Sequence, residues 1–167
     1  SLEENIKLDF VSFKQIVGVA NEALDISVVT LIDQGNKFNV LFNPLGIDSL
    51  ISGNIPTDSG PYYTFDYPEA SGYNSQFTTS HVWDVNPYSN GIQVIMETEE
   101  NSSVPMAGSS GSAICNQAGQ VIGIHSMKMV NNPHQFIVEP NPDNIQDQVK
   151  TAINEAKEKL KLLGYIY

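Results

Sequence analysis

Short runs of β-branched and aromatic residues, broken by Gly, Pro, Asn and Asp, fill most of this chain and limit what it can fold into. Residues 10–17 alternate apolar and polar side chains, which is the period of a half-buried strand. Residues 26–32 are rich in Ile, Val and Thr, and a turn at 33–36 joins them to 37–42, which predicts a hairpin. We expect long loops around short strands in 43–91, and further strands over 92–96, 112–116, 121–129 and 135–138.

The end of the chain follows a different period. Apolar residues recur there at every third or fourth position, as on one face of a helix: Ile145, Val149, Ile153, Ala156, Leu160 and Leu163. Residues 141–144 supply Pro and Asn at the start of this helix, and Gly164 can cap its end. The sequence therefore predicts a mostly β, antiparallel fold closed by one C-terminal amphipathic helix.

The charge of the chain excludes several kinds of partner. Its 167 residues include 19 acidic residues, eight lysines and no arginine, so the net charge is −11. Residues 1–140 carry all of it, because 141–167 hold four acidic residues and four lysines. Such a chain lacks the basic surface that DNA or RNA requires, and anionic lipid would repel it. No apolar run reaches the roughly 18–20 residues that cross a bilayer, so we expect neither a nucleic-acid nor a membrane partner.

The sequence carries no motif for a metal or a cofactor. Cys115 is the single cysteine, which excludes an internal disulfide framework and a multi-cysteine zinc site. No phosphate loop or dinucleotide fingerprint occurs. We therefore expect no metal site and no cofactor, and we expect Cys115 to pack in the core.

The segment Gly108-Ser109-Ser110-Gly111-Ser112-Ala113 is the part of the chain that indicates chemistry. It places a serine between two glycines and leads directly into a strand. A nucleophilic serine needs a tight turn whose backbone N–H groups are free to bind an oxyanion, and glycine permits such a backbone. The motif alone is also compatible with a flexible loop, so its context decides between the two.

That context resembles the trypsin-like and chymotrypsin-like serine peptidases, and in particular the bacterial glutamyl endopeptidases. In that family the nucleophile lies in a Gly-x-Ser-Gly-Gly/Ser-Pro loop, and a Val-Ile-Gly-Ile strand follows. This sequence has the loop quoted above, with Ala113 where Pro is usual, and then Val121-Ile122-Gly123-Ile124. Leu24-Asp25-Ile26-Ser27-Val28-Val29 has the form of the strand that the family's catalytic aspartate opens. The segment 51–56 loosely resembles the first strand of the family's second barrel.

The resemblance implies a catalytic role for three residues. Ser110 would be the nucleophile of a serine endopeptidase that works through an acyl-enzyme. The N–H groups of Gly108 and Ser110 would form the oxyanion hole. Asp25 would orient the histidine and stabilise its imidazolium.

The resemblance also implies a substrate-binding role for three residues near the loop. The backbone of Ser126 would pair with the substrate strand, and His125 stands where glutamyl endopeptidases bind the acidic side chain of the substrate. Lys128 would add positive charge there or block the pocket. Pro105 departs from the Ser or Thr of that branch, and the −11 net charge would oppose an acidic substrate.

The general base of such an enzyme is not evident in this sequence. A serine needs an adjacent base, and the family's Thr-Ala-x-His motif precedes the aspartate, whereas no histidine precedes Asp25. His81 follows Asp25 and lies too close to Ser110 in sequence for the family order. His134 falls in a polar turn, where we expect it to be solvated. We therefore expect a remnant of the first barrel over 1–45, the second barrel over 46–140 and a helix over 141–167.

Three interpretations stay open at this point. The chain is the C-terminal part of a peptidase whose N-terminal half, or another chain, supplies the histidine and whose partner is a peptide or protein substrate. Alternatively it is an inactive trypsin-like fold that serves as a protein-binding module, or an unrelated β domain in which Ser110 is incidental. The lack of disulfides suits a secreted bacterial peptidase as well as a cytoplasmic protein, and the resemblance favours a secreted or cell-surface location.

Overall fold

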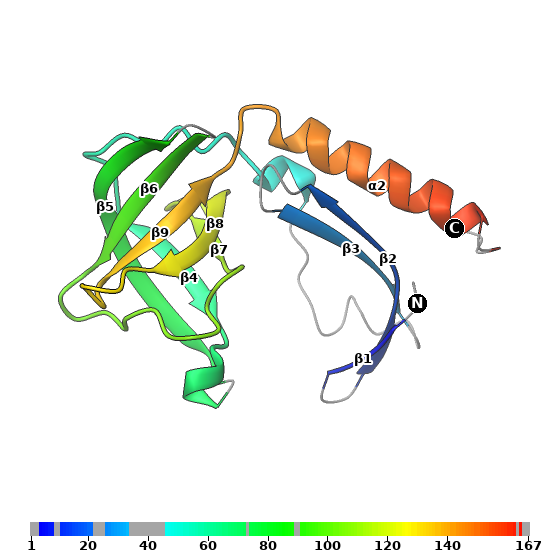
Figure 1. Ribbon diagram of the computed structural model, residues 1–167, viewed down its shortest axis with the longest axis horizontal. Helices are drawn as coiled ribbons and strands as arrows, with labels where there is room; N and C mark the ends of the chain where they lie inside the picture. The colour runs from blue at the N-terminus through cyan, green and yellow to red at the C-terminus, as the bar shows by residue number, and fades with distance from the viewer. Residues whose placement is uncertain are drawn as a thin grey trace. The chain divides into compact units, whose positions relative to one another are not determined.

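The chain divides into two compact units in a computed structural model that describes residues 4–8, 11–21, 26–33, 46–72, 74–88, 91–162 and 164 (Figure 1). Unit 1 comprises Ser1–Ile47 and Gln146–Tyr167, and unit 2 comprises Asp48–Ile145. Unit 2 is therefore inserted into unit 1 along the sequence.

Unit 1 contains a three-stranded antiparallel sheet and a helix. The strands β1 (Glu4–Leu8), β2 (Val11–Asn21) and β3 (Ile26–Asp33) follow one another in the sheet as they do in the sequence. The strands expected over 10–17 and 26–32 are thus confirmed, and 26–33 pairs with β2. The second arm of the expected hairpin, 37–42, lies outside the described residues.

The helix α2 (Ile145–Leu162) confirms the helical period at the end of the chain. Its buried side chains include Ala156 and Leu160, which belong to the expected apolar face. Gly164 follows with φ +85°, and its N–H donates to the Lys161 carbonyl at 3.0 Å. A left-handed residue with this bond is a usual C-terminal cap, and glycine adopts it without strain.

Unit 2 is a closed antiparallel barrel of six strands (Figure 1). Around the barrel the order is β4-β5-β6-β9-β8-β7, and pairing of β4 with β7 closes it. Short 3-10 turns lie at Ile47–Ser49 and Glu69–Ser71. The strands are β4 (Tyr62–Asp66), β5 (Gln76–Tyr88), β6 (Gly91–Thr98), β7 (Ala113–Cys115), β8 (Val121–Lys128) and β9 (Gln135–Pro140).

The core of the barrel is apolar at its centre. Its fully buried side chains include Val94, Met96, Ile114, Phe136 and Val138, contributed by the three strands β6, β7 and β9. Burial of each such side chain stabilises the fold by about 1.5–3 kcal/mol. Cys115, which we expected in this core, alternates with Ile114 on β7 and is only half-buried, so that expectation is wrong.

The expectation of short strands and long loops over 43–91 is wrong for residues 76–88. They form β5, which has 13 residues and pairs with both β4 and β6. The apolar pattern is inverted there, because Gln76, Thr78 and Ser80 point inward and are buried while Phe77 is exposed. A sequence that alternates buried polar residues with an exposed aromatic residue lacks the hydropathy pattern that predicts a core strand.

The two ends of unit 2 are tied together by one buried side chain. The Asn141 amide donates to the carbonyls of Ile51 at 2.9 Å and Val121 at 2.8 Å. Its backbone N–H donates to Ile122, and its carbonyl accepts from Gly53 at 2.7 Å. Residues 51–56 are thus held by these bonds and by a single parallel bridge from Leu50 to Val121, and not as the strand that the resemblance suggested.

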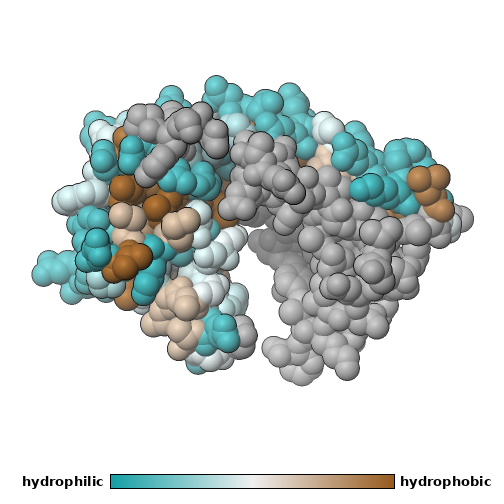
Figure 2. Space-filling model, in the orientation of Figure 1, coloured by the Kyte–Doolittle hydropathy of each residue, from teal (hydrophilic) through white to brown (hydrophobic). Residues whose placement is uncertain are grey.

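The surface in Figure 2 is polar over most of α2, whereas apolar residues interrupt the polar surface of the barrel. Among the described residues, no helix is long and apolar enough to cross a membrane.

Candidate active site

Ser110 lies in a tight turn between β6 and β7, and its side chain is exposed. The turn is held on both sides by the backbone of His125 on β8. The Gly111 N–H donates to the His125 carbonyl at 2.8 Å, and the His125 N–H donates to the Ser112 carbonyl at 2.9 Å. Ser109, the residue before Ser110, is 1% exposed, and its hydroxyl accepts from the Met106 N–H. The turn is therefore anchored around a serine that faces solvent.

Two glycines give this turn its shape. Gly108 has φ +93° and Gly111 has φ +91°, a region that other residues rarely adopt. A Cβ on Gly108 would lie 2.8 Å from the Glu69 backbone nitrogen, whereas a Cβ on Gly111 would meet nothing within 4 Å. Gly108 is required both by its φ and by the close approach of the chain near Glu69.

The backbone donors expected for an oxyanion hole are available. Within the part of the chain that the structure describes, the N–H groups of Gly108 and Ser110 donate to no protein acceptor. Both residues are exposed, so a substrate oxygen can approach them. Two N–H groups without an acceptor among the described residues, beside a serine hydroxyl, are compatible with the oxyanion hole that the sequence predicts.

The hydroxyl of Ser110 is bound to Ser126. Its Oγ donates to the Ser126 carbonyl, with an Oγ–O distance of 2.7 Å. Ser126 is the residue whose backbone was expected to pair with a substrate strand, and the structure thus brings these two residues together. The carbonyl accepts the hydrogen bond of the hydroxyl but is not a base that could take its proton during nucleophilic attack.

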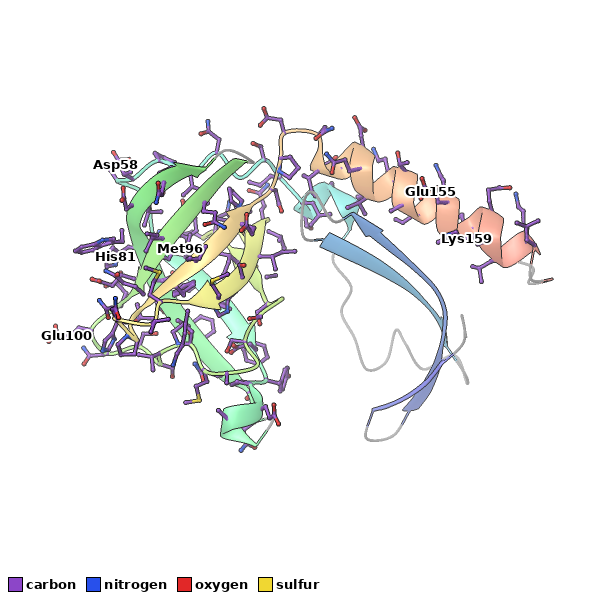
Figure 3. All side chains as sticks on the ribbon, in the orientation of Figure 1. Asp58, His81, Met96, Glu100, Glu155 and Lys159 are labelled. Atoms are coloured by element: carbon purple, nitrogen blue, oxygen red, sulfur yellow. The ribbon has the colours of Figure 1, made fainter. Side chains whose placement is uncertain are left out.

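None of the three histidines bonds to Ser110 in the described residues. His81 lies on β5, where its Nδ1 is 3.0 Å from Glu99 Oε1 and its Nε2 is 3.9 Å from Glu97 Oε1 (Figure 3). His134 is exposed, as expected, and its Nδ1 lies 3.1 Å from Thr98 Oγ1. Asp25 lies outside the described residues, directly before β3.

His125 points into the barrel, where it is 3% exposed and packs edge-on against Phe136. Burial lowers the pKa of its imidazole, while the backbone of Ser109, the charge of Asp66 and the backbone of Met127 act in the opposite direction. Its Nε2 has no hydrogen-bond partner among the described residues. Lys128, at the end of the same strand, is exposed.

Sequence reasoning missed the buried polar side chains of β4 and β5, among them Asp66, whose charge acts on His125. Thr64 Oγ1 and Asp66 Oδ1 on β4 are buried and, like His125 Nε2, have no partner in the described residues. Gln76 donates to the Val104 carbonyl at 2.6 Å, in the loop that leads to Ser110. The two-residue alternation of a strand is present in β4 and β5, but polar residues occupy the buried positions where apolar residues are usual.

Comparison with known proteins assigns the fold. No protein-family model and no curated protein sequence matches the chain. Solved structures do match, among them "Rv3671c protease from M. tuberculosis" in its active form, with a TM-score of 0.61 and 13% identity over 87% of this chain and 62% of that one. Its inactive form matches with a TM-score of 0.60 and 12% identity, over 89% of this chain and 71% of that one.

A third match is a variant of the same protease in an inactive form, in which a serine is replaced by alanine. It has a TM-score of 0.58 and 12% identity, over 92% of this chain and 70% of that one. This chain thus spans less than two thirds of the length of the active form. The fold described above, a closed six-stranded antiparallel barrel with one C-terminal helix, is therefore similar to the fold of trypsin-like protease domains.

Proposed function

We propose that these residues form part of a serine endopeptidase in which Ser110 is the nucleophile. The observation that carries the proposal is the geometry of the Ser110 turn. An exposed serine stands between two glycines with positive φ, beside two backbone N–H groups that have no acceptor among the described residues. The positive φ at 108 and 111 suits glycine at both positions, and N–H groups left free beside an exposed serine are the arrangement that oxyanion stabilisation needs.

The chemistry follows the acyl-enzyme route of such a site. Ser110 Oγ attacks the carbonyl carbon of the scissile bond while its proton passes to a histidine. The oxyanion that forms accepts hydrogen bonds from the N–H groups of Gly108 and Ser110, and each such donor contributes about 10²–10³ in rate. The histidine then gives the proton to the leaving amine, and water hydrolyses the ester on Ser110 with the same histidine as base.

We propose that this histidine comes from outside the 167 residues, on another segment of the same protein or on a second chain. His81 and His134 bond to other side chains, and His125 is buried in the barrel. On this proposal residues 1–45 belong to a first barrel, with Asp25 at the start of a strand, and 46–140 form the second.

Cleavage after glutamate is the specificity that His125 supports. The backbone of His125 holds the Ser110 turn, and its buried ring has one nitrogen without a partner among the described residues, so on this proposal the substrate carboxylate has to reach that ring inside the barrel. Because burial lowers the pKa of the ring, its neutral form is favoured, and pairing with a substrate carboxylate requires the ring to take up a proton from solvent. We therefore expect cleavage after glutamate to strengthen as the pH is lowered toward the range in which the ring is protonated.

Labelling of the full-length protein with a fluorophosphonate probe tests the proposal. We expect the wild type to react, Ser110→Ala to lose the label, and Ser112→Ala, a serine of the same loop, to keep it. Residues 1–167 alone should not react. A full-length protein that stays unlabelled, or a label that survives in Ser110→Ala, would contradict the assignment.

A protein-binding module without catalytic activity is the second candidate. The bond from Ser110 Oγ to the Ser126 carbonyl favours it, because that hydroxyl is already satisfied without a base. The same labelling experiment separates the two, since a module leaves both the wild type and Ser110→Ala unlabelled.

A further inference from the structure

Four aromatic side chains form a continuous patch on the outside of β4 and β5. Tyr63 and Phe77 stack with ring centroids 5.6 Å apart, and Phe65 meets Tyr67 edge-on at 5.4 Å. Phe65 and Phe77 are directly opposite each other in the strand register, which joins the two pairs. We call these four residues the aromatic face.

The aromatic face is exposed, and neighbouring side chains that point into the barrel are polar. Phe65, Tyr67 and Phe77 are 56%, 58% and 55% exposed, while Thr64 and Thr78 on the same strands are buried. A strand that served the barrel alone would place its aromatic rings inside. Large rings gathered on one outer face are typical of an interaction surface.

An open pocket of about 540 Å³ adjoins Phe77. Its walls are formed by the ring of Phe77 and by the loop that follows β6, and its lining residues are Phe77, Thr79, Glu99, Glu100, Asn101, Ser102 and Ser103. Glu99 is fixed in place by His81, and the Ser102 hydroxyl accepts from the Thr79 N–H at 2.7 Å. The pocket therefore combines an aromatic wall with two carboxylates and hydroxyl groups.

These groups suit a cationic side chain with an apolar stem. A guanidinium or ammonium group binds the face of an aromatic ring and pairs with carboxylates, and its methylene stem packs against the same ring. The surrounding unit has the matching sign of charge. Asp48–Ile145 contains ten carboxylates and only Lys128 as a basic side chain, which leaves a net charge of −9.

We propose that the aromatic face and its pocket bind a basic segment of a protein partner, with an arginine or lysine side chain in the pocket and apolar residues on the rings. Neither nucleic acid nor anionic lipid fits a surface of this charge. A second copy of the chain would bring the same negative charge against itself. This inference is independent of the reaction at Ser110.

Binding of short synthetic peptides to the full chain tests it, measured by fluorescence anisotropy on the Ser110→Ala protein so that no peptide is cleaved. One peptide alternates arginine and leucine, and two matched peptides carry glutamine or glutamate in place of each arginine. We expect the arginine peptide to bind about tenfold or more tightly than the glutamine peptide, and the glutamate peptide not to bind. Added salt should weaken the binding.

Variants locate the binding on the molecule. Phe77→Ser and the pair Glu99→Gln with Glu100→Gln should each weaken it about tenfold or more. The pair Asp48→Asn with Asp58→Asn removes the same charge from exposed sites elsewhere on the unit and should change it little. Figure 3 shows Asp58 well apart from Glu100. If Phe77→Ser fails to fold, the Glu99 and Glu100 variant gives the answer.

Three results would overturn the proposal. The first is equal binding of the arginine and glutamate peptides, and the second is no binding of the arginine peptide. The third is a loss of affinity in the Asp48 and Asp58 control as large as the loss in the Glu99 and Glu100 variant. Sedimentation of the chain alone provides a further check, because a dimer that Phe65→Thr dissolves would show that a second copy covers the aromatic face. Loss of fluorophosphonate labelling bears only on Ser110 and leaves this proposal standing.

Discussion

The two glycines on either side of Ser110 provide a matched pair of substitutions for testing how the nucleophile turn is built. Both have nearly the same φ, +93° for Gly108 and +91° for Gly111. They differ in what an added methyl group would meet. A Cβ on Gly108 would lie 2.8 Å from the Glu69 backbone nitrogen and 3.3 Å from the Glu69 Cβ, and a Cβ on Gly111 would lie in open space.

The expected destabilisation separates backbone strain from steric conflict. Gly111→Ala should cost about 1–2 kcal/mol, the strain of a left-handed backbone for an L-residue. Gly108→Ala carries the same strain and also forces the backbone near Glu69 to move, which adds about 1–3 kcal/mol. Each additional 1 kcal/mol corresponds to about 2–4 °C in Tm for a chain of this size.

Thermal unfolding followed by the fluorescence of Trp83 measures this difference. Trp83 is the single tryptophan and lies on β5, so the signal reports on the barrel. We expect the Tm of Gly108→Ala to lie below that of Gly111→Ala by at least about 2–4 °C. Equal Tm values for the two variants would refute the reasoning, since they would show that the approach of Glu69 to Gly108 places no constraint on the turn.

Two further predictions concern buried titratable groups. Because the pKa of His125 is lowered in the fold, the unfolded chain binds a proton that the native chain excludes, and stability should fall as the pH drops below about 6.5. Urea unfolding measures this loss of stability, which should be smaller in His125→Gln than in the wild type and unchanged in the control His134→Gln. An identical pH profile for His125→Gln and the wild type would exclude His125 as its cause. Burial raises the pKa of the Cys115 thiol, so iodoacetamide should modify it more slowly at pH 8 than it modifies a cysteine peptide, with urea removing the difference. Equal rates without urea would contradict it.

The sequence predicted the elements in which apolar residues carry the period. β6 and β9 have buried apolar residues at alternate positions, β8 begins with the buried apolar pair Val121 and Ile122, and α2 has buried apolar residues at helical spacing. In β5 the buried positions at Gln76, Thr78 and Ser80 are polar, so hydropathy placed the strand in a loop. Such residues become strand residues only when both neighbouring strands satisfy their backbone, which is a tertiary effect.

The candidate site could be predicted from the sequence because its loop is short and local. Gly108, Ser110 and Gly111 define the turn within four residues of sequence, so their arrangement could be expected from the motif. The anchoring of that turn by the His125 backbone and the contact of Gly108 with Glu69 join segments far apart in sequence. No local pattern reports such contacts, because they depend on how the barrel closes.

The bonds of Asn141 have a consequence for how the barrel can be handled as a module. Asn141 lies near the point where the chain leaves unit 2. It bonds to Ile51 and Gly53, near the point where the chain enters the unit, and also to β8. The entry and exit of the barrel therefore lie side by side, as they do in domains that tolerate insertion into a host protein. Because the bonds of Asn141 join the two ends of residues 48–145, we expect a short linker between those ends to close the unit without opening its sheet.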